Sequence, residues 1–120
     1  MIAARAQRQA PRGNFRHNYK VGDILVYSWG HDETFVEFYR VVRRTPSTVS
    51  VRRIASKTVP GSEYRGSARV VALPGQFLES GKLLAKRVQP STAQPEGYIS
   101  MPHGLLSRWN GEPRHCSWFG

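Results

Sequence analysis

Residues 21–42 read VGDILVYSWGHDETFVEFYRVV and form the densest run of apolar and aromatic side chains in the chain. The Val-Gly-Asp at the start is typical of a turn that precedes a strand, and β-branched and aromatic residues follow it at 24–27. Polar residues at 30–33 interrupt the apolar run, which resumes at 35–42. The stretch therefore predicts two strands, 24–27 and 35–42, to which the rest of the chain adds further strands.

Turn signals divide the chain after this pair into more short strands. A Pro-Ser pair at 46–47 is the first signal, because proline presets the backbone angle of a turn and cannot lie in a central strand. A Pro-Gly pair at 74–75 ends another apolar run, and polar, proline-containing loops are expected at 56–66 and 89–97. The strands predicted between these signals are residues 48–54, 68–73 and 82–88.

Asn110 and Gly111 separate two short runs of strand-forming residues near the C-terminus. Asn-Gly favours a type I′ turn, because both central residues of that turn need a positive φ angle. The sequence therefore predicts a β-hairpin in which residues 104–109 pair with residues 112–119.

Short strands at short intervals, without internal repeats or heptads, indicate a mainly β fold. We predict a small antiparallel, partly closed, SH3-like β-barrel with a basic N-terminal arm. A chain of 120 residues is expected to form a single domain. We place the flexible arm at residues 1–18 and the barrel at residues 19–120.

The charge balance points to polyanionic partners. The chain has 18 lysines and arginines against 8 aspartates and glutamates, which gives a formal net charge of +10. Such a chain attracts nucleic acid, an anionic membrane face or an acidic protein surface, although a basic surface can also be inert. We expect nucleic acid, a host protein or a ribonucleoprotein complex as the partner, and neither a membrane nor a small-molecule substrate.

Composition also disfavours several classes of site and location. The single cysteine, Cys116, excludes an internal disulfide and a zinc site made of several cysteines. No apolar run approaches the roughly 20 residues that a transmembrane helix needs, and the N-terminus lacks the apolar core of a secretory signal. We therefore expect a cytoplasmic protein.

The N-terminal arm carries regularly spaced basic residues and no acidic residue. Pro11 and Gly13 argue against a long helix in this region. We expect the arm to assist binding through Arg12 and Arg16. A solvated leader without a binding role is one alternative, and an organelle transit peptide is another. The basic residues concerned are Arg5, Arg8, Arg12, Arg16 and Lys20.

Two separated pieces of the chain carry a recognisable pattern. VGDI-x-V-x-SWG matches residues 21–30, and D-x-T-x-V-x-F-Y-x-V-V matches residues 32–42. W-x-G-x-P matches residues 109–113, and residues 117–119 read SWF where the pattern has SWY. In these features the chain resembles a family of small proteins encoded by bacteriophages and mobile elements. The resemblance implies a compact β fold, a phage or mobile-element origin and a bacterial host cell, and it implies no particular chemistry.

Residues with catalytic or metal-binding chemistry are present, but they do not form a complete set. The His-Asp-Glu sequence at 31–33 puts an imidazole beside two carboxylates, although neighbours on a turn point in different directions. His103, His115 and Cys116 could supply zinc ligands, but adjacent residues of a strand face opposite sides. We therefore predict no catalytic residue, no metal site and no cofactor. A small hydrolase that uses residues 31–33 is the remote alternative.

The basic hairpin formed by the second and third predicted strands is the best candidate site. Arginine suits phosphate because its planar guanidinium can donate two hydrogen bonds at once. If the turn consists of residues 46–47, Arg40 faces Arg53, and like charges held opposite each other can receive an anion. A solvated basic face that protects an edge strand is the alternative. The predicted contact residues are Arg40, Arg43, Arg44, Arg52, Arg53 and Lys57, with Trp29 and Tyr39 as stacking surfaces for unpaired bases.

Two functions are compatible with these features. The first is a phage or mobile-element accessory protein that binds nucleic acid, or a complex containing it, through the arginine-rich hairpin. The second is an inhibitor of a host defence system, comparable with an anti-CRISPR protein, that occupies a surface of its partner. A nucleic-acid binder should be sensitive to salt, whereas an inhibitor should form a stoichiometric complex in which aromatic residues matter as much as charges.

Overall fold

The computed structural model describes residues 15–30 and 34–117, which form an 8-stranded antiparallel sheet. This part of the chain contains no helix, and hence none that is long and apolar enough to cross a membrane. The mainly β, antiparallel fold predicted from the sequence is confirmed. The strands are β1 (Ile24–Trp29), β2 (Phe35–Arg44), β3 (Thr48–Thr58), β4 (Ser67–Phe77), β5 (Leu83–Arg87), β6 (Ile99–Met101), β7 (Gly104–Arg108) and β8 (Arg114–Ser117).

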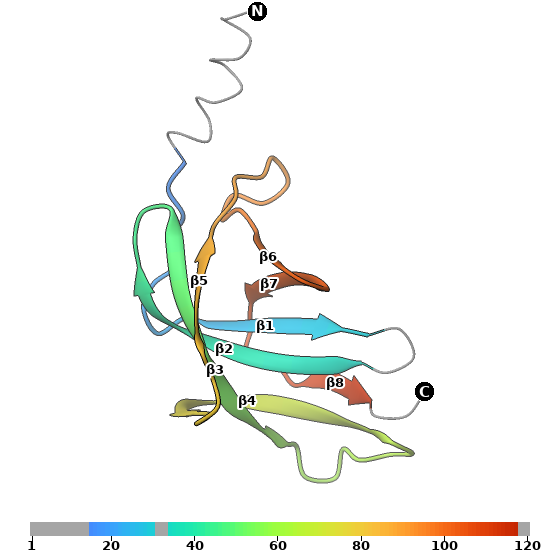
Figure 1. Ribbon diagram of the computed structural model, residues 1–120. Coiled ribbons are helices and arrows are strands. Elements are labelled where there is room, and N and C mark those ends of the chain that lie inside the picture. The colour runs from blue at the N-terminus through green and yellow to red at the C-terminus, as the bar shows by residue number, and fades with distance from the viewer. Residues whose placement is uncertain (1–14, 31–33, 118–120) are drawn as a thin grey trace, which may run out of the picture.

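The strand order is β6-β7-β1-β2-β3-β4-β8, with β5 also paired to β3 (Figure 1). The long strand β3 organises this arrangement, because one of its edges pairs with β2 and the other pairs first with β5 and then with β4. The end strands β6 and β8 are not paired with each other, so the sheet is open within the described residues. An isolated bridge between Thr34 and Ser117 connects β8 to the residue before β2.

The middle parts of the central strands β1, β2 and β3 contribute apolar side chains to a core on each face of the sheet. On one face, Leu25, Tyr39 and Val51 belong to a hydrophobic cluster, which we call the first core. Residues outside the three strands complete this core, among them Tyr19, Val88, Ile99 and Leu106. On the opposite face, Val26, Phe38 and Ile54 pack with Ala72 of β4 in a second core, and Trp109 lies against them. Successive side chains of each central strand therefore enter different cores.

The register of the β2–β3 hairpin differs from the predicted one. Arg40 is paired with Arg52, and not with Arg53, because β2 contains a β-bulge between Val41 and Arg43. A bulge adds one residue to one strand, so pairing is shifted by one position beyond it. The shift moves Arg53 to a position opposite Tyr39.

The predicted C-terminal hairpin is wrong. Both edges of β7 are occupied, by β1 and by β6, and β8 pairs with β4 instead. Among the described residues other than glycine, only Arg65 has a positive φ, so Asn110 does not adopt the type I′ conformation. The Asn110 side chain instead accepts a hydrogen bond from Glu112 N at 3.0 Å, and Trp109 Nε1 donates to Glu112 O at 2.7 Å.

The predicted end of β4 is also displaced. The Pro-Gly pair at 74–75 does not stop the strand, which continues to Phe77. The pairing with β3 jumps from Ala72 opposite Ser56 to Phe77 opposite Ile54. Residues 73–76 thus form a wide irregularity, in which proline has no ladder hydrogen bond to lose.

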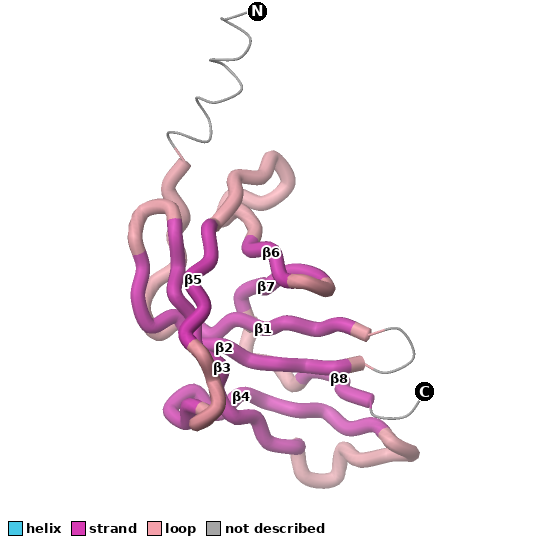
Figure 2. Tube along the Cα trace, in the orientation of Figure 1, coloured by secondary structure: helices cyan, strands magenta, loops and turns pink. Residues whose placement is uncertain are grey.

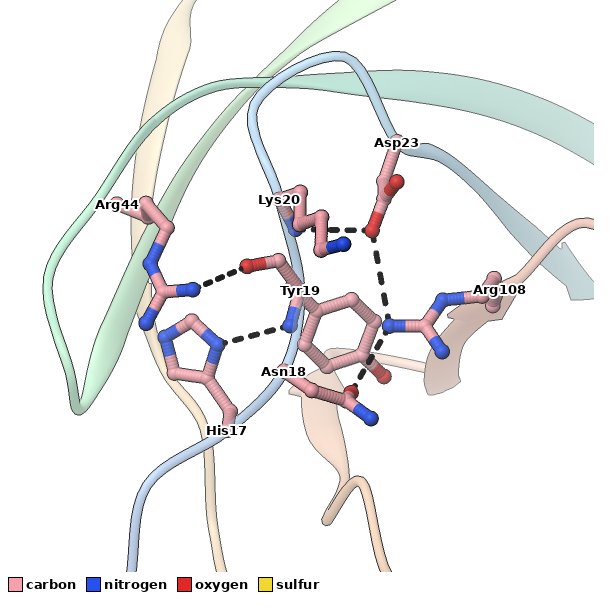
Figure 3. A network of polar contacts seen from close by, with 7 residues as sticks. All are labelled: His17, Asn18, Tyr19, Lys20, Asp23, Arg44 and Arg108. Atoms are coloured by element: carbon pink, nitrogen blue, oxygen red, sulfur yellow. Dashed lines mark hydrogen bonds and ion pairs between the residues drawn. The ribbon is translucent and has the colours of Figure 1, made fainter.

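The segment before β1 is anchored to the first core and to the β2–β3 turn. Phe15 packs against this core, Tyr19 is 1% exposed, and His17 is 4% exposed. The His17 ring nitrogen Nε2 lies 2.6 Å from Thr45 O and 2.9 Å from Thr48 O, while Nδ1 accepts a hydrogen bond from Tyr19 N at 3.2 Å (Figure 3 shows the latter contact). Since carbonyls only accept, Nε2 carries the proton. The boundary between arm and domain at residue 18 stays a prediction.

Candidate functional site

Arg40 and Arg52 form a directly opposed pair of like charges on the β2–β3 hairpin. Their cross-strand neighbours Phe38 and Ile54 belong to the second core, which places both arginines on the face of that core. Each side chain is half-buried. Like charges held opposite each other on a sheet are unfavourable by roughly 0.2–1 kcal/mol, so this pairing costs the fold stability.

Phe77 lies beside both guanidinium groups. The Cζ atoms of Arg52 and Arg40 are 4.9 and 5.8 Å from the centre of its ring. Arg40 Nη1 also donates a hydrogen bond to Pro74 O at 3.1 Å, within the irregular part of β4. The irregularity therefore brings an aromatic ring beside both cations and a carbonyl oxygen to Arg40, which offsets part of the repulsion between the two arginines.

Three more residues share this face by register. The β-bulge in β2 sets Arg43 opposite Ser50, so that Arg43 lies on the same face as Arg40 and Arg52. On β5, Leu83 is paired with Arg52, and Arg87 is paired with Thr48. Arg43, Leu83 and Arg87 are exposed. We call the group formed by Arg40, Arg43, Arg52, Phe77 and Leu83 the Phe77 surface.

The cations of the Phe77 surface lack acidic partners within the described residues. Two ion pairs are formed among the described residues, one between Arg53 and Glu37 and one between Arg108 and Asp23. Neither includes an arginine of the Phe77 surface. Glu79, in the turn between β4 and β5, is exposed and makes no ion pair with a described residue. The surface therefore presents positive charge that an external anion could neutralise.

The turn between β4 and β5 is held closely against β3. Leu78 N donates to Arg53 O at 3.2 Å, and Gly81 N donates to Leu78 O at 3.0 Å. A Cβ atom added at Gly81 would lie 3.1 Å from Leu78 O and 3.3 Å from Arg53 O, a tight fit against backbone atoms. This packing sets Phe77 and Leu83, at the two ends of the turn, against the same edge of β3.

Arg44 and Arg53, which were also predicted as contact residues, lie on the other face. Arg44 Nη1 donates a hydrogen bond to Tyr19 O at 2.7 Å and so holds the segment before β1 (Figure 3). Arg53 Nη1 lies 3.6 Å from Glu37 Oε2. Its Nε is buried without a hydrogen-bond partner. Both arginines are thus engaged in contacts within the fold.

Tyr39, predicted as a stacking surface, is buried at 6% exposure. Its hydroxyl donates a hydrogen bond to Glu37 Oε1 at 2.5 Å. Burial raises the pKa of the Tyr39 hydroxyl above its ordinary value of 10.0, and the hydrogen bond to Glu37 and the charge of that carboxylate raise it further. Tyr39 therefore serves the core, where its ring offers no face to a ligand.

Trp29, the last residue of β1, is the centre of a stack of aromatic rings. Its ring lies 4.7 Å from that of Tyr27, 5.1 Å from that of Phe35 and 6.2 Å from that of His103, and all three pairs are stacked. Trp29 is half-buried, whereas Phe35 is 42% exposed. This aromatic stack belongs to the face of the first core and is separate from the Phe77 surface.

The remaining candidates are dispersed. Lys57 is exposed on β3, at an odd number of residues from Arg52, so it faces the opposite side. Arg16 is exposed and its Nη1 donates to Phe15 O at 3.0 Å. Arg12 and the loop at 31–33 lie outside the described residues.

The three candidate zinc ligands are divided between two parts of the fold. His103 lies in the turn between β6 and β7, whereas His115 and Cys116 are neighbours on β8, paired with Arg69 and Ala68. Among residues 15–30 and 34–117, no three His, Cys, Asp or Glu side chains gather into a group that could hold a metal ion.

Sequence reasoning missed Phe77. An aromatic residue shortly after a Pro-Gly pair carries no signal of its own, because its position beside Arg40 and Arg52 depends on how many residues the irregularity in β4 contains. The chain matches no protein-family model, no curated protein sequence and no solved structure.

Proposed function

We propose that this chain is an accessory protein of a phage or mobile element that binds nucleic acid, or a complex containing it, through the Phe77 surface of the arginine-rich hairpin. The observation that carries the proposal is the pairing of Arg40 with Arg52, both beside Phe77 and without an ion-pair partner among the described residues. Repulsion between the two cations disfavours this arrangement in the free protein. A phosphate between them would turn that cost into two charge-assisted contacts.

The rest of the chain supports the same function through long-range electrostatics. A net charge of +10 on 120 residues draws a polyanion to any cationic surface, and contacts to phosphates are largely independent of sequence. Arg12 and Arg16, with the remainder of the arm, would add contacts beyond the hairpin. On this proposal the protein works without catalysis in the cytoplasm of a bacterial host, and the hydrolase at 31–33 is the remote alternative.

The proposal includes a partly closed, SH3-like barrel as the scaffold of the binding surface. The bridge between Thr34 and Ser117 supports it, because this bridge joins β8, which is paired with β4, to the start of β2. Closure of this kind would keep the hairpin rigid against the second core.

Fluorescence anisotropy of labelled oligonucleotides tests the proposal. We expect binding whose affinity falls by one to several powers of ten between about 50 and 200 mM salt, in proportion to the number of phosphates contacted. A protein with Arg40→Ser and Arg52→Ser should bind much more weakly than a control with Arg65→Ser and Arg69→Ser. The control loses the same charge from exposed positions near the other end of β4.

Equal losses in the two double variants would show that binding reflects net charge alone and would exclude the Phe77 surface as the site. Absence of binding at about 50 mM salt would exclude nucleic acid itself as the ligand.

The aromatic stack favours a second candidate function, inhibition of a host defence system by occupation of a partner's surface. Phe35 is exposed next to Trp29, and aromatic residues of this kind are enriched in the centres of protein interfaces. On this alternative, the protein should form a stoichiometric complex with a host protein, and Phe35→Ala should abolish that complex. Absence of such a complex, together with oligonucleotide binding that Phe35→Ala leaves unchanged, supports the nucleic-acid function.

A further inference from the structure

We infer that the Phe77 surface selects single-stranded nucleic acid, with one unpaired base stacked on the Phe77 ring and an adjacent phosphate held by Arg40 and Arg52. The inference rests on the proposed function and adds to it the strandedness of the ligand. It assigns to Phe77 a role in ligand binding that charge alone cannot supply.

The first argument is the exposure of apolar atoms in the middle of a cationic surface. Phe77 is 36% exposed and Leu83 is 49% exposed, although both are large apolar side chains on a small protein. Both flank Arg52, since Leu83 is paired with it and Phe77 is paired with Ile54 on the same edge of β3. What distinguishes these side chains from other exposed apolar residues is their position beside the arginines, which offers a ligand an apolar contact next to charged ones.

The second argument is the distance between the ring and the cations. The guanidinium carbons lie 4.9 and 5.8 Å from the ring centre, so the ring and the charges occupy one small area. Within a nucleotide a single sugar separates the base from the phosphate, and one nucleotide can therefore engage both features. Duplex DNA offers its phosphates to the arginines but keeps its base faces stacked inside the helix, away from the ring.

The third argument is the rigidity of the support. Phe77 belongs to a strand, and the turn that follows it packs tightly on β3 through Gly81 and the hydrogen bond from Leu78 N to Arg53 O. Arg40 is further oriented by its hydrogen bond to Pro74 O. The ring and at least one cation are thus positioned before a ligand arrives, which lowers the entropic cost of binding.

Three probes of equal length test the inference at one salt concentration: a single-stranded oligothymidine, an abasic deoxyribose-phosphate strand and a blunt-ended duplex. Wild-type protein should bind the oligothymidine roughly tenfold more tightly than the abasic strand, as expected for one stacked base. Phe77→Leu, which keeps an apolar side chain without a ring, should reduce that preference to about twofold or less. Its affinity for the abasic strand and the duplex should be unchanged. Phe77→Trp should retain or increase the preference.

Each other outcome overturns the inference. A parallel loss for all three probes in Phe77→Leu would mean that the ring only positions the arginines, and a wild-type protein that prefers the duplex would exclude a single-strand site. In both cases the proposed function would stand. If the wild-type protein binds none of the probes, the proposed function and the inference fail together. Thermal unfolding establishes whether the variants are folded. If Phe77→Leu is unfolded, Phe77→Trp decides whether the ring stacks on a base, because a loss of the preference for oligothymidine in this variant would overturn the inference.

Discussion

Arg52 and Arg53 are neighbours on β3, yet their guanidinium groups serve opposite faces of the sheet. The Arg52 group lies over Phe77 and opposes Arg40, whereas the Arg53 group pairs with Glu37 on the face of the first core. Adjacent residues of a strand point to opposite sides, so one basic dipeptide contributes both to a surface and to the fold.

Serine substitutions at these two positions should therefore have opposite consequences. Arg52→Ser removes a repulsive pair and should leave the free energy of unfolding within about 0.5 kcal/mol of the wild-type value, while oligonucleotide affinity falls. Arg53→Ser removes the ion-pair partner of Glu37, which keeps only the hydrogen bond from the Tyr39 hydroxyl, and should cost about 1 kcal/mol of stability, with a smaller effect on affinity. Urea denaturation and anisotropy measure the two quantities.

Because both variants lose one positive charge from the same strand, each serves as the control for the other. If the two variants lose affinity equally, the distinction between the faces has no bearing on binding.

The buried His17 should contribute substantially to stability. His17→Phe keeps an aromatic ring but removes the hydrogen-bond partner of Thr45 O and of the buried Tyr19 N, and it leaves Thr48 O with only the hydrogen bond from Thr45 N. We expect a loss of roughly 1–3 kcal/mol in chemical denaturation. The same substitution at the exposed His115 should change stability by less than about 0.5 kcal/mol. Similar losses at the two positions would show that the His17 hydrogen bonds add nothing.

Two glycines with the same backbone angle separate the effect of conformation from that of packing. Gly97 and Gly61 both have a φ of 77°, but a Cβ atom at Gly97 would collide with Gln89 O and approach Phe15 Cζ to 2.7 Å, whereas no atom lies within 4 Å at Gly61. Gly61→Ala should cost about 1–2 kcal/mol through the positive φ alone. Gly97→Ala should cost at least about 2 kcal/mol more, because backbone and core must move. Thermal or urea unfolding of both variants checks this, and equal losses would contradict the packing argument.

The buried Tyr39 should make the protein sensitive to alkali. Its pKa is raised by burial and by Glu37, so the folded state holds the phenolic proton more tightly than the unfolded state does. This contribution to stability is fully present below the ordinary pKa of 10.0 and is lost as the pH rises beyond it. Between about pH 8 and pH 11, Tyr39→Phe should lose roughly 1 kcal/mol less unfolding free energy than the wild type.

Urea denaturation at the two pH values measures this difference. The variant should keep part of the alkaline sensitivity, because burial also raises the pKa of Tyr19. Identical losses in the wild type and in Tyr39→Phe would contradict the assignment to Tyr39.

Features that depend on neighbouring residues could be predicted from the amino-acid sequence. The apolar runs at 24–27 and 35–42 became β1 and β2, the Pro-Ser pair at 46–47 became the turn before β3, and residues 82–88 contain β5. Local side-chain pattern is sufficient for such elements, because strand formation and turn formation are decided within a few residues. The excess of arginine on β2 and β3 was equally visible.

Only the tertiary structure decided which strands pair with each other and on which face of the sheet each side chain lies. The pairing of β8 with β4 depends on residues far apart in the chain, and the edges of β7 were already occupied by β1 and β6. A single extra residue, Val42 in the bulge, places Arg52 opposite Arg40, where the predicted register has Arg53. Because side chains alternate between faces with a period of two, one added residue moves a charge from one surface to the other. The sequence thus determined the strands and the positive charge of this protein, whereas its three-dimensional packing selected the arginines that meet Phe77.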